Sequence, residues 1–332
     1  MTNPLEQITN LIDKSHRILI TSHKDPDGDS IGSQLALAEF LESRNKEFRI
    51  INQGQIPNKY RFLDSQGKIL SQDTKENFKP DLVIVLECAG LDRIGWVSKL
   101  IEPEAKIINI DHHLDNDRFG TVNLLNSDAS AVGETIYDIF KYLNYPISQN
   151  AATNLYAAIL TDTGRFRFSN TTSRCLEICA ELVRYGANPK LITDQIYFGL
   201  EKSYMSLLGY LLSSMQFFEN ERICLFELKK GTLEKYGVGP NETEGLVDHT
   251  LFTKGVVVGI LLIELEENRV KVGLRSQNNF DVSKLAKEFG GGGHKNAAGC
   301  IVSEKLEQVK QLILKQIGKE LKCELGGVAI TQ

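Results

Sequence analysis

Short apolar stretches alternate with helical patterns in the first half of the sequence, and this alternation restricts the fold more than any other feature. Four stretches are short and apolar enough to be buried β-strands that lead into polar turns: residues 17–21, 47–51, 82–86 and 106–110. Helical periodicity appears between and after them, over residues 30–43, 130–143, 151–161 and 172–185. This order predicts an α/β fold with a doubly wound, mostly parallel sheet and helices on both faces.

The pattern changes around residues 186–189, where Gly186 and Pro189 interrupt the periodicity. Beyond this point, strand-like alternation returns at residues 223–228, 256–263 and 270–274, and helical patterns follow near 282–289 and 306–317. We therefore predict a first domain over residues 1–186, a linker over 187–204, and a smaller C-terminal α/β domain over 205–332.

Composition narrows the class of protein and its partners. The formal net charge of the 332 residues is −5, which disfavours binding along a long nucleic acid and leaves short or small phosphorylated ligands open. No apolar run of about 18 residues is present, and residues 1–11 read as an amphipathic helix, so we expect neither membrane association nor secretion. The cysteines are scattered without a C-x-x-C pair, which fits a reducing cytoplasm. The oligomeric state stays open, a homodimer included.

Polar clusters follow three of the predicted strands, at residues 23–29, 87–88 and 111–113, and a fourth cluster at 161–164 ends a predicted helix. Loops at the carboxyl ends of parallel strands converge on one crevice, so these clusters should meet in space. Their carboxylates would then repel one another unless cations lay between them. The carboxylates concerned are those of Asp27, Asp29, Glu87, Asp111 and Asp162.

Imidazoles and carboxylates without a set of thiolates favour Mn²⁺, Co²⁺ or Mg²⁺ over a structural zinc. Taken singly, each cluster has a simpler interpretation: residues 25–29 as a solvated turn, Glu87 as a helix cap, and the histidines as packing residues. A calcium loop fits poorly, since Ser30 and Ala36 stand where glycine and glutamate are required. The joint placement of the clusters favours a shared metal site.

A glycine run at residues 290–293 lies between a predicted helix and the strand-like residues 300–302. It is no Walker loop, because Lys295 is not followed by Ser or Thr. Glycine backbones approach a phosphate closely, so a ligand-binding loop is favoured over a simple tight turn. Its expected members are Gly291, Gly292, Gly293, His294 and Lys295, with Arg275 and Ser276 at the end of the preceding strand as partners.

These motifs together resemble the DHH phosphoesterase superfamily, which is named for the sequence seen here at residues 111–113. Residues 23–33 resemble its first motif, 87–95 its second and 161–164 its fourth. The second half, with residues 275–276 and 290–299, is similar to the DHH-associated C-terminal domain, which in this family closes over the active site and holds the substrate phosphate and base. The two-domain layout is most similar to oligoribonucleases that also act as phosphatases on 3′-phosphoadenosine 5′-phosphate.

The resemblance implies a role for each matching residue around two divalent ions, of which manganese is the first choice. His23 and Asp27 would bind one ion, position 87 would bridge both, and the second ion would be bound by Asp29, His112 and Asp162. Asp111 would orient a histidine ligand, and His113 would face the scissile phosphate.

The first two motifs each contain one residue that differs from the family pattern. Glu87 occupies a position where the family usually carries Asp, and Asp25 one where many members carry Asn. A bridging glutamate is compatible with activity, so we expect hydrolysis of short oligoribonucleotides and of 3′-phosphoadenosine 5′-phosphate. A phosphodiesterase for cyclic or linear di-AMP is the alternative within the enzyme class. A nucleotide-binding regulatory module disabled by Glu87 is the alternative outside it.

Overall fold

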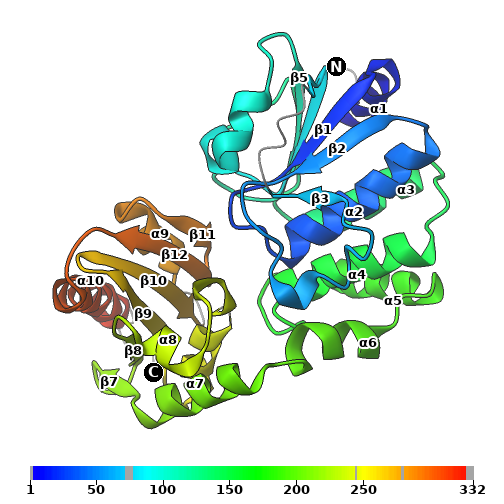
Figure 1. The fold of residues 1–332 in the computed structure, drawn as a ribbon. Coiled ribbons are helices and arrows are strands. Elements are labelled where there is room, and N and C mark those ends of the chain that lie inside the picture. The colour runs from blue at the N-terminus through cyan, green and yellow to red at the C-terminus, as the bar shows by residue number, and fades with distance from the viewer. Residues whose placement is uncertain (1–2, 72–77, 244, 278–279, 327–332) are drawn as a thin grey trace. The chain divides into compact units, whose positions relative to one another are not determined.

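The structure of the chain, a computed structural model, describes residues 3–71, 78–243, 245–277 and 280–326. The chain divides into two compact units, Met1–Gly199 and Leu200–Gln332, whose elements are labelled in Figure 1. Each unit has its own sheet and its own hydrophobic core. Within the described ranges, no helix combines the length and the apolar character that crossing a membrane requires.

The first unit contains a six-stranded sheet, in the order β3-β2-β1-β4-β5-β6, in which all neighbouring strands run parallel. Its strands are β1 (Arg17–Thr21), β2 (Glu47–Ile51), β3 (Ile69–Leu70), β4 (Leu82–Leu86), β5 (Lys106–Asp111) and β6 (Val122–Leu125). The four predicted strands are confirmed, and β5 extends one residue further than predicted. The two edge strands, β3 and β6, were not predicted because they are too short to show a clear apolar pattern.

The strand order reverses between β1 and β4. The chain first builds β2 and β3 on one side of β1, and then returns to build β4, β5 and β6 on the other side. In open α/β sheets, ligands bind outside the carboxyl ends of the strands at such a reversal. The chain connections that leave the two adjacent strands run in opposite directions there, and a crevice opens between them. The residues that follow β1 and β4 therefore lie where this fold offers a binding site.

Helices flank this sheet, as expected. The α-helices of the unit are α1 (Pro4–Lys14), α2 (Gly28–Ser43), α3 (Val132–Tyr142), α4 (Gln149–Asp162) and α5 (Ser173–Arg184). Residues of these helices share one core with Ile20 and Ile84 of the sheet. The opposite face, which includes Leu19 and Val83, packs against the 3₁₀-helical segment η2 (Leu91–Leu100). A further short 3₁₀ helix, η1, spans Asn58–Tyr60.

Residues 187–204, predicted as a linker, contain helical structure. They include α6 (Pro189–Thr193) and the π-helical turn η3 (Asp194–Phe198). The side chains of Ile192 and Ile196 are buried in the core of the first unit. The next helix, α7 (Lys202–Ser213), belongs to the second unit.

The second unit is also a mixed α/β structure, with a six-stranded sheet in the order β11-β12-β10-β9-β8-β7. Its strand pairs are antiparallel except for β8 and β9, which are parallel. Alternate residues of β9 enter two different cores, Ile260 on one face and Leu261 on the other, because successive side chains of a strand point to opposite faces. The first of these cores includes residues of α9 and α10, and the second includes residues of α7 and η5.

The elements of the second unit after α7 follow one another closely along the chain. They are β7 (Gln216–Phe218), β8 (Ile223–Leu228), α8 (Thr232–Tyr236), η4 (Pro240–Glu242), η5 (Leu246–Phe252), β9 (Val258–Glu266), β10 (Arg269–Ser276), α9 (Val282–Glu288), β11 (Gly292–His294), β12 (Ala297–Val302) and α10 (Leu306–Gly326). The predicted strands at 223–228, 256–263 and 270–274 and the two predicted helices are confirmed, with shifts at their ends.

The glycine run is partly a strand, so the prediction of a loop is wrong for residues 292–294. β11 pairs antiparallel with β12 and forms a hairpin at the edge of the sheet. A Cβ atom at Gly291 would lie 2.1 Å from the carbonyl oxygen of Gly299, so glycine is needed where the two backbones approach. The pairing depends on the neighbouring strand, which the local glycine pattern does not reveal.

Candidate metal centre

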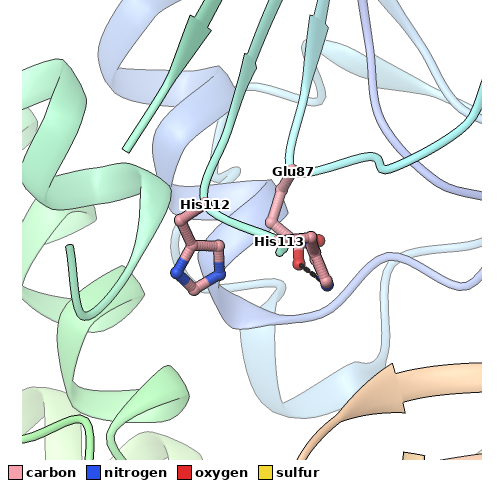
Figure 2. A group of neighbouring side chains, drawn as sticks. All are labelled: Glu87, His112 and His113. Carbon is pink, nitrogen blue, oxygen red and sulfur yellow. Dashed lines mark ion pairs between the residues drawn. The ribbon is translucent and has the colours of Figure 1, made fainter. Parts of the chain in front are cut away.

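The carboxyl edge of the first unit's sheet brings the predicted histidines and carboxylates together. His23 follows β1, Glu87 follows β4, and residues 111–113 end and follow β5. Figure 2 shows Glu87, His112 and His113 side by side at the ends of their strands, with an ion pair drawn between Glu87 and His113. The strands β1 and β4 flank the reversal of the sheet order, and β5 pairs with β4, so the fold itself explains the convergence.

Two helix ends complete the cluster. Asp27 is the N-cap of α2, and its Oδ1 accepts a hydrogen bond of 3.0 Å from the backbone N–H of Ser30. Asp29 lies in the first turn of the same helix, and Asp162 is the last residue of α4. The carboxylate of Asp29 accepts hydrogen bonds of 2.6 and 2.9 Å from the first two backbone N–H groups of α3, on residues 132 and 133. Backbone N–H groups therefore hold the carboxylates of Asp27 and Asp29 in place.

One group of possible metal ligands consists of His23, Asp27 and Glu87. Their ligand atoms all lie within 4.8 Å of one another. His23 Nε2 is 2.5 Å from Glu87 Oε2 and 4.0 Å from Asp27 Oδ2. One imidazole nitrogen and two carboxylate oxygens thus face a common point.

A second group consists of Asp29, His112 and Asp162, again with ligand atoms within 4.8 Å of one another. His112 Nδ1 donates to the carbonyl oxygen of Ala129 at 3.0 Å, since a carbonyl only accepts. The neutral imidazole then presents its lone pair at Nε2, which lies 3.5 Å from Asp162 Oδ2. The carbonyl of Ala129 therefore orients His112 as a metal ligand requires.

Glu87 connects the first group to His112 of the second. Its carboxylate belongs to the first group and to a third one, which it forms with His112 and His113. The side chain is buried, and its backbone φ is +51°, a left-handed conformation that is unusual for a glutamate. Strain of this kind persists where the surrounding structure imposes it, most often at functional sites.

Asp111 orients His113 rather than His112. Its Oδ1 accepts a hydrogen bond of 2.7 Å from His113 Nδ1, and its Oδ2 accepts one of 2.6 Å from the side chain of Asn116. His113 Nε2 then points to the cluster, 3.6 Å from Glu87 Oε1. The resemblance implies that Asp111 orients a histidine ligand, and the hydrogen bond of its carboxylate goes to the ring of His113, which belongs to the third ligand group.

The charges of the cluster do not balance without added cations. Burial raises the pKa of Glu87 well above its ordinary value, and the carboxylate of Asp27 raises it further. Burial also raises the pKa of Asp162 to about 8. For His112, burial favours the neutral form, but Asp162 and Asp29 outweigh it and raise the pKa to about 9. The cluster on its own therefore retains protons that divalent cations would replace.

The donor set fits two adjoining divalent ions. Burial lowers the pKa of His23 and so keeps its imidazole neutral, as a metal ligand must be. The remaining donors are carboxylate oxygens and the imidazole of His112, a combination that suits Mn²⁺ and similar ions. Cys88, next to Glu87, directs its thiol to the carbonyl of Gly90. Burial raises the pKa of this thiol to about 12 and disfavours the thiolate that a metal would bind.

The predicted substrate-binding residues all lie in the second unit. Arg275, near the end of β10, pairs with Asp248 through Nε at 2.7 Å and donates from Nη1 to the carbonyl of Leu274. Ser276 is buried, and its hydroxyl donates to the carbonyl of Phe280 at 2.6 Å, which makes it a link within the unit.

The glycine hairpin lies beside Arg275, because Arg275 pairs with Ala297 of β12. The first strand of this hairpin contains Gly292 and Gly293, and Gly291 directly precedes it. Lys295 lies at the turn of the hairpin and is exposed. The side chain of His294 lies outside the described residues. The two units thus carry the two groups of predicted site residues separately.

Sequence reasoning missed two groups that orient the histidines. The side chain of Asn116 holds Asp111, and the carbonyl of Ala129 holds His112. An asparagine three residues after a histidine pair is a weak signal, and a backbone carbonyl gives no sequence signal at all.

The comparisons with known proteins agree with this geometry. Residues 17–159 match the DHH family, N-terminal domain, and residues 223–322 match the DHHA1 domain. A Thermus thermophilus protein named bifunctional oligoribonuclease and PAP phosphatase NrnA is 32% identical, over 92% of this chain and 90% of its own length. A Bacillus subtilis protein of the same name is 31% identical, over 86% of this chain and 89% of its own length.

A solved structure agrees as well. The crystal structure of an exopolyphosphatase-related protein from Bacteroides fragilis has a TM-score of 0.88 to this chain at 29% identity, and the match covers 96% of this chain and 97% of that one. The chain is therefore a member of the DHH phosphoesterase family, with a DHHA1 domain after its DHH domain.

Proposed function

We propose that this phosphoesterase uses two divalent ions to hydrolyse short oligoribonucleotides to mononucleotides and 3′-phosphoadenosine 5′-phosphate to AMP. The observation that carries the proposal is the pair of three-residue ligand groups that a third group, Glu87 with His112 and His113, connects by sharing Glu87 with one and His112 with the other. The printed names of the relatives, oligoribonuclease and PAP phosphatase, support the choice of substrates.

In this proposal His23, Asp27 and Glu87 would hold one ion, and Asp29, His112 and Asp162 would hold a second ion to which Glu87 would also be a ligand. Manganese is the first choice, because imidazole and carboxylate ligands suit it. Bound ions of this kind activate water and neutralise charge on the phosphoryl oxygens. The protein contributes by fixing the ligands on strand and helix ends before substrate arrives.

His113 is proposed to contact the scissile phosphate. Asp111 accepts a hydrogen bond from its Nδ1 and so holds the ring, while Asn116 holds Asp111. When protonated, His113 can donate from Nε2 to a phosphoryl oxygen and so favour the charge that develops there. Its catalytic contribution then depends on the intact chain of hydrogen bonds through Asp111.

The second unit is proposed to bind the rest of the substrate phosphate through Arg275, Ser276, the glycines of the hairpin, His294 and Lys295. The exposed ammonium of Lys295 and the position of Arg275 beside the hairpin support this assignment. Because Asp248 pairs with Arg275, a phosphate must share this guanidinium with that carboxylate. The five described cysteines are buried free thiols, which fits the cytoplasm as the place of action.

A hydrolysis panel tests the proposal. Purified protein is incubated with and without Mn²⁺ and with short RNA, 3′-phosphoadenosine 5′-phosphate, linear and cyclic di-AMP, and pyrophosphate, and products are separated by chromatography. We expect Mn²⁺-dependent release of mononucleotides from RNA and of AMP from the bisphosphate. Hydrolysis of cyclic di-AMP alone would contradict the substrate assignment, and metal-independent turnover would contradict the metal centre. His112→Ala should be inactive, while His16→Ala, at an exposed histidine outside the cluster, should keep wild-type activity.

A further inference from the structure

The backbone makes an unusual turn directly after α4, two residues beyond Asp162. Gly164, Arg165 and Phe166 have φ angles of +55°, +64° and +61°, so three consecutive residues adopt the left-handed conformation. This conformation is unfavourable for residues with a side chain, and two of the three carry a large one. Strained backbone of this kind marks places where the position of a side chain matters.

Hydrogen bonds hold this turn next to the metal centre. The carbonyl of the buried Thr163 accepts from the backbone N–H groups of Arg167 and Phe168, both at 3.0 Å. The side chain of Asn170 donates to the carbonyl of Asp162 at 3.1 Å, so the turn both starts and ends at this proposed metal ligand. Residues 163–170 therefore stay close to Asp162.

The side chains of the turn separate into two kinds. The phenylalanines face the protein: Phe166 packs against Tyr156, with ring centroids 6.3 Å apart, and the ring of Phe168 covers Gly164 so closely that an added Cβ would lie 2.5 Å from it. The arginines are exposed. This separation places two cations, Arg165 and Arg167, on the surface three and five residues after Asp162.

Each guanidinium lies on an aromatic ring. That of Arg165 is 4.7 Å from the ring centroid of Tyr197, and that of Arg167 is 5.6 Å from the ring centroid of Phe168. Such contacts hold a guanidinium against a ring and limit its motion. Within the described ranges, no carboxylate forms an ion pair with Arg165, although a carboxylate cluster is only three residues away in the sequence.

We infer that Arg165 and Arg167 form a subsite for a second phosphate of the substrate, next to the phosphate that is hydrolysed. The inference rests on the proposed function and adds a requirement to it: the preferred substrate carries two phosphates on one nucleoside or on adjacent ones. Guanidinium groups bind phosphate through paired, charge-assisted hydrogen bonds. Three residues of chain span at most about 10 Å, so Arg165 can reach a group next to one held at Asp162.

The test compares substrates that differ only in the second phosphate. The value of kcat/KM is measured for 3′-phosphoadenosine 5′-phosphate and for adenosine 3′-monophosphate, with wild type, Arg165→Ala, Arg167→Ala and Arg165→Lys. We expect wild type to prefer the bisphosphate, and each alanine variant to lose roughly tenfold or more on it, mainly through KM, with little change on the monophosphate. Arg165→Lys should be intermediate, because it keeps the charge without the paired donors.

Arg44→Ala is the matched control. Arg44 also lies over an aromatic ring, 5.1 Å from the centroid of Phe40, but it caps the end of α2 opposite to Asp27. It should keep both the activity and the preference of wild type, and thermal unfolding should show that all variants fold.

The outcomes separate this inference from the proposed function. The subsite would be overturned if wild type hydrolysed both nucleotides and the ratio of the two kcat/KM values were the same in Arg165→Ala and Arg167→Ala as in wild type. The proposed function would then still stand. An equal loss on both nucleotides would also overturn it, since that pattern indicates a structural role. If wild type hydrolysed neither nucleotide, the proposed function and the subsite would both fall.

Discussion

At the residue scale, the proposed metal centre depends most on Glu87. It is buried, adopts a left-handed backbone conformation, and faces His23 with one oxygen and His113 with the other. The sequence predicted its place in the cluster because it follows a buried strand. The backbone strain and the contact with His113 depend on the packing of neighbouring strands, so no local pattern reveals them.

Replacing Glu87 by Gln keeps the shape of the side chain and removes its charge. Because burial and Asp27 raise the pKa of Glu87, the metal-free protein already disfavours a charge there. We expect the Tm of metal-free Glu87→Gln to stay within a few degrees of wild type. The increase in Tm on adding Mn²⁺ should be largely lost, since a weaker Kd reduces stabilisation by a bound ligand.

Thermal unfolding with and without Mn²⁺ checks this prediction. Glu134→Gln is the control, because Glu134 is also buried and has a raised pKa but belongs to none of the ligand groups. The same Mn²⁺ shift in wild type and Glu87→Gln would show that Glu87 binds no metal.

The metal-free protein should lose stability as the pH rises from about 4 to about 9. Burial raises the pKa of Asp162 from 3.8 to about 8, so its charging penalises the folded state increasingly across that range. The pKa of His112 is raised from 6.5 to about 9, so the stability from its ion pair is present below 6.5 and is lost as the pH passes 9. Both groups act in the same direction.

Tm measured against pH in a chelating buffer tests this expectation, and Mn²⁺ should reduce the decline. Asp162→Asn should flatten the metal-free curve, because it removes the buried carboxylate whose pKa is raised. A metal-free Tm that rises between pH 6 and 9 in wild type would contradict these pKa directions.

At the element scale, the long and strongly patterned elements were predictable and the short ones were not. The interior strands β1 and β4 and helices such as α2 follow from apolar runs and periodicity. Edge strands such as β3 and β11 depend on a partner strand for their existence, so their own residues carry little signal.

The hairpin of β11 and β12 gives a prediction at this scale. Gly291→Ala should destabilise the second unit by about 1–3 kcal/mol, because its Cβ would lie 2.1 Å from the carbonyl oxygen of Gly299. Gly209→Ala in α7 is the control, since a Cβ there meets nothing within 4 Å and alanine favours helix. Urea unfolding of both variants checks the difference, and equal stability would contradict the close approach at Gly291.

At the scale of the whole molecule, charge favours small substrates. The formal net charge is −5, so phosphates beyond those in the site meet a surface that is negative overall. We expect kcat/KM to be highest for RNA of a few nucleotides and to fall for long RNA. The slope of log(kcat/KM) against log[salt] should be shallow. Each contacted phosphate of a single strand contributes about −0.7, so three phosphates give a slope of roughly −2. A steep slope with preference for long RNA would contradict this expectation.

The change of pattern predicted a linker over residues 187–204, and the structure divides into two units between Gly199 and Leu200. Each unit's sheet explains where its predicted residues lie. The six candidate metal ligands could be expected to lie together because five of them occur in clusters at the carboxyl ends of strands or in the turn and helix that follow, and the sixth ends α4. The turn at residues 163–170, which carries Arg165 and Arg167, could not be predicted. Its shape follows from hydrogen bonds to the carbonyl groups of Thr163 and Asp162, which no local sequence pattern encodes.

The most direct test of the central claim is a crystal structure with Mn²⁺, with data collected at a wavelength where manganese scatters anomalously. The account predicts two anomalous peaks in the first unit, one beside His23 and Asp27 and the other beside Asp29, His112 and Asp162, with the carboxylate of Glu87 between them. A single peak, or peaks that Glu87 does not contact, would contradict a two-metal centre joined through this residue.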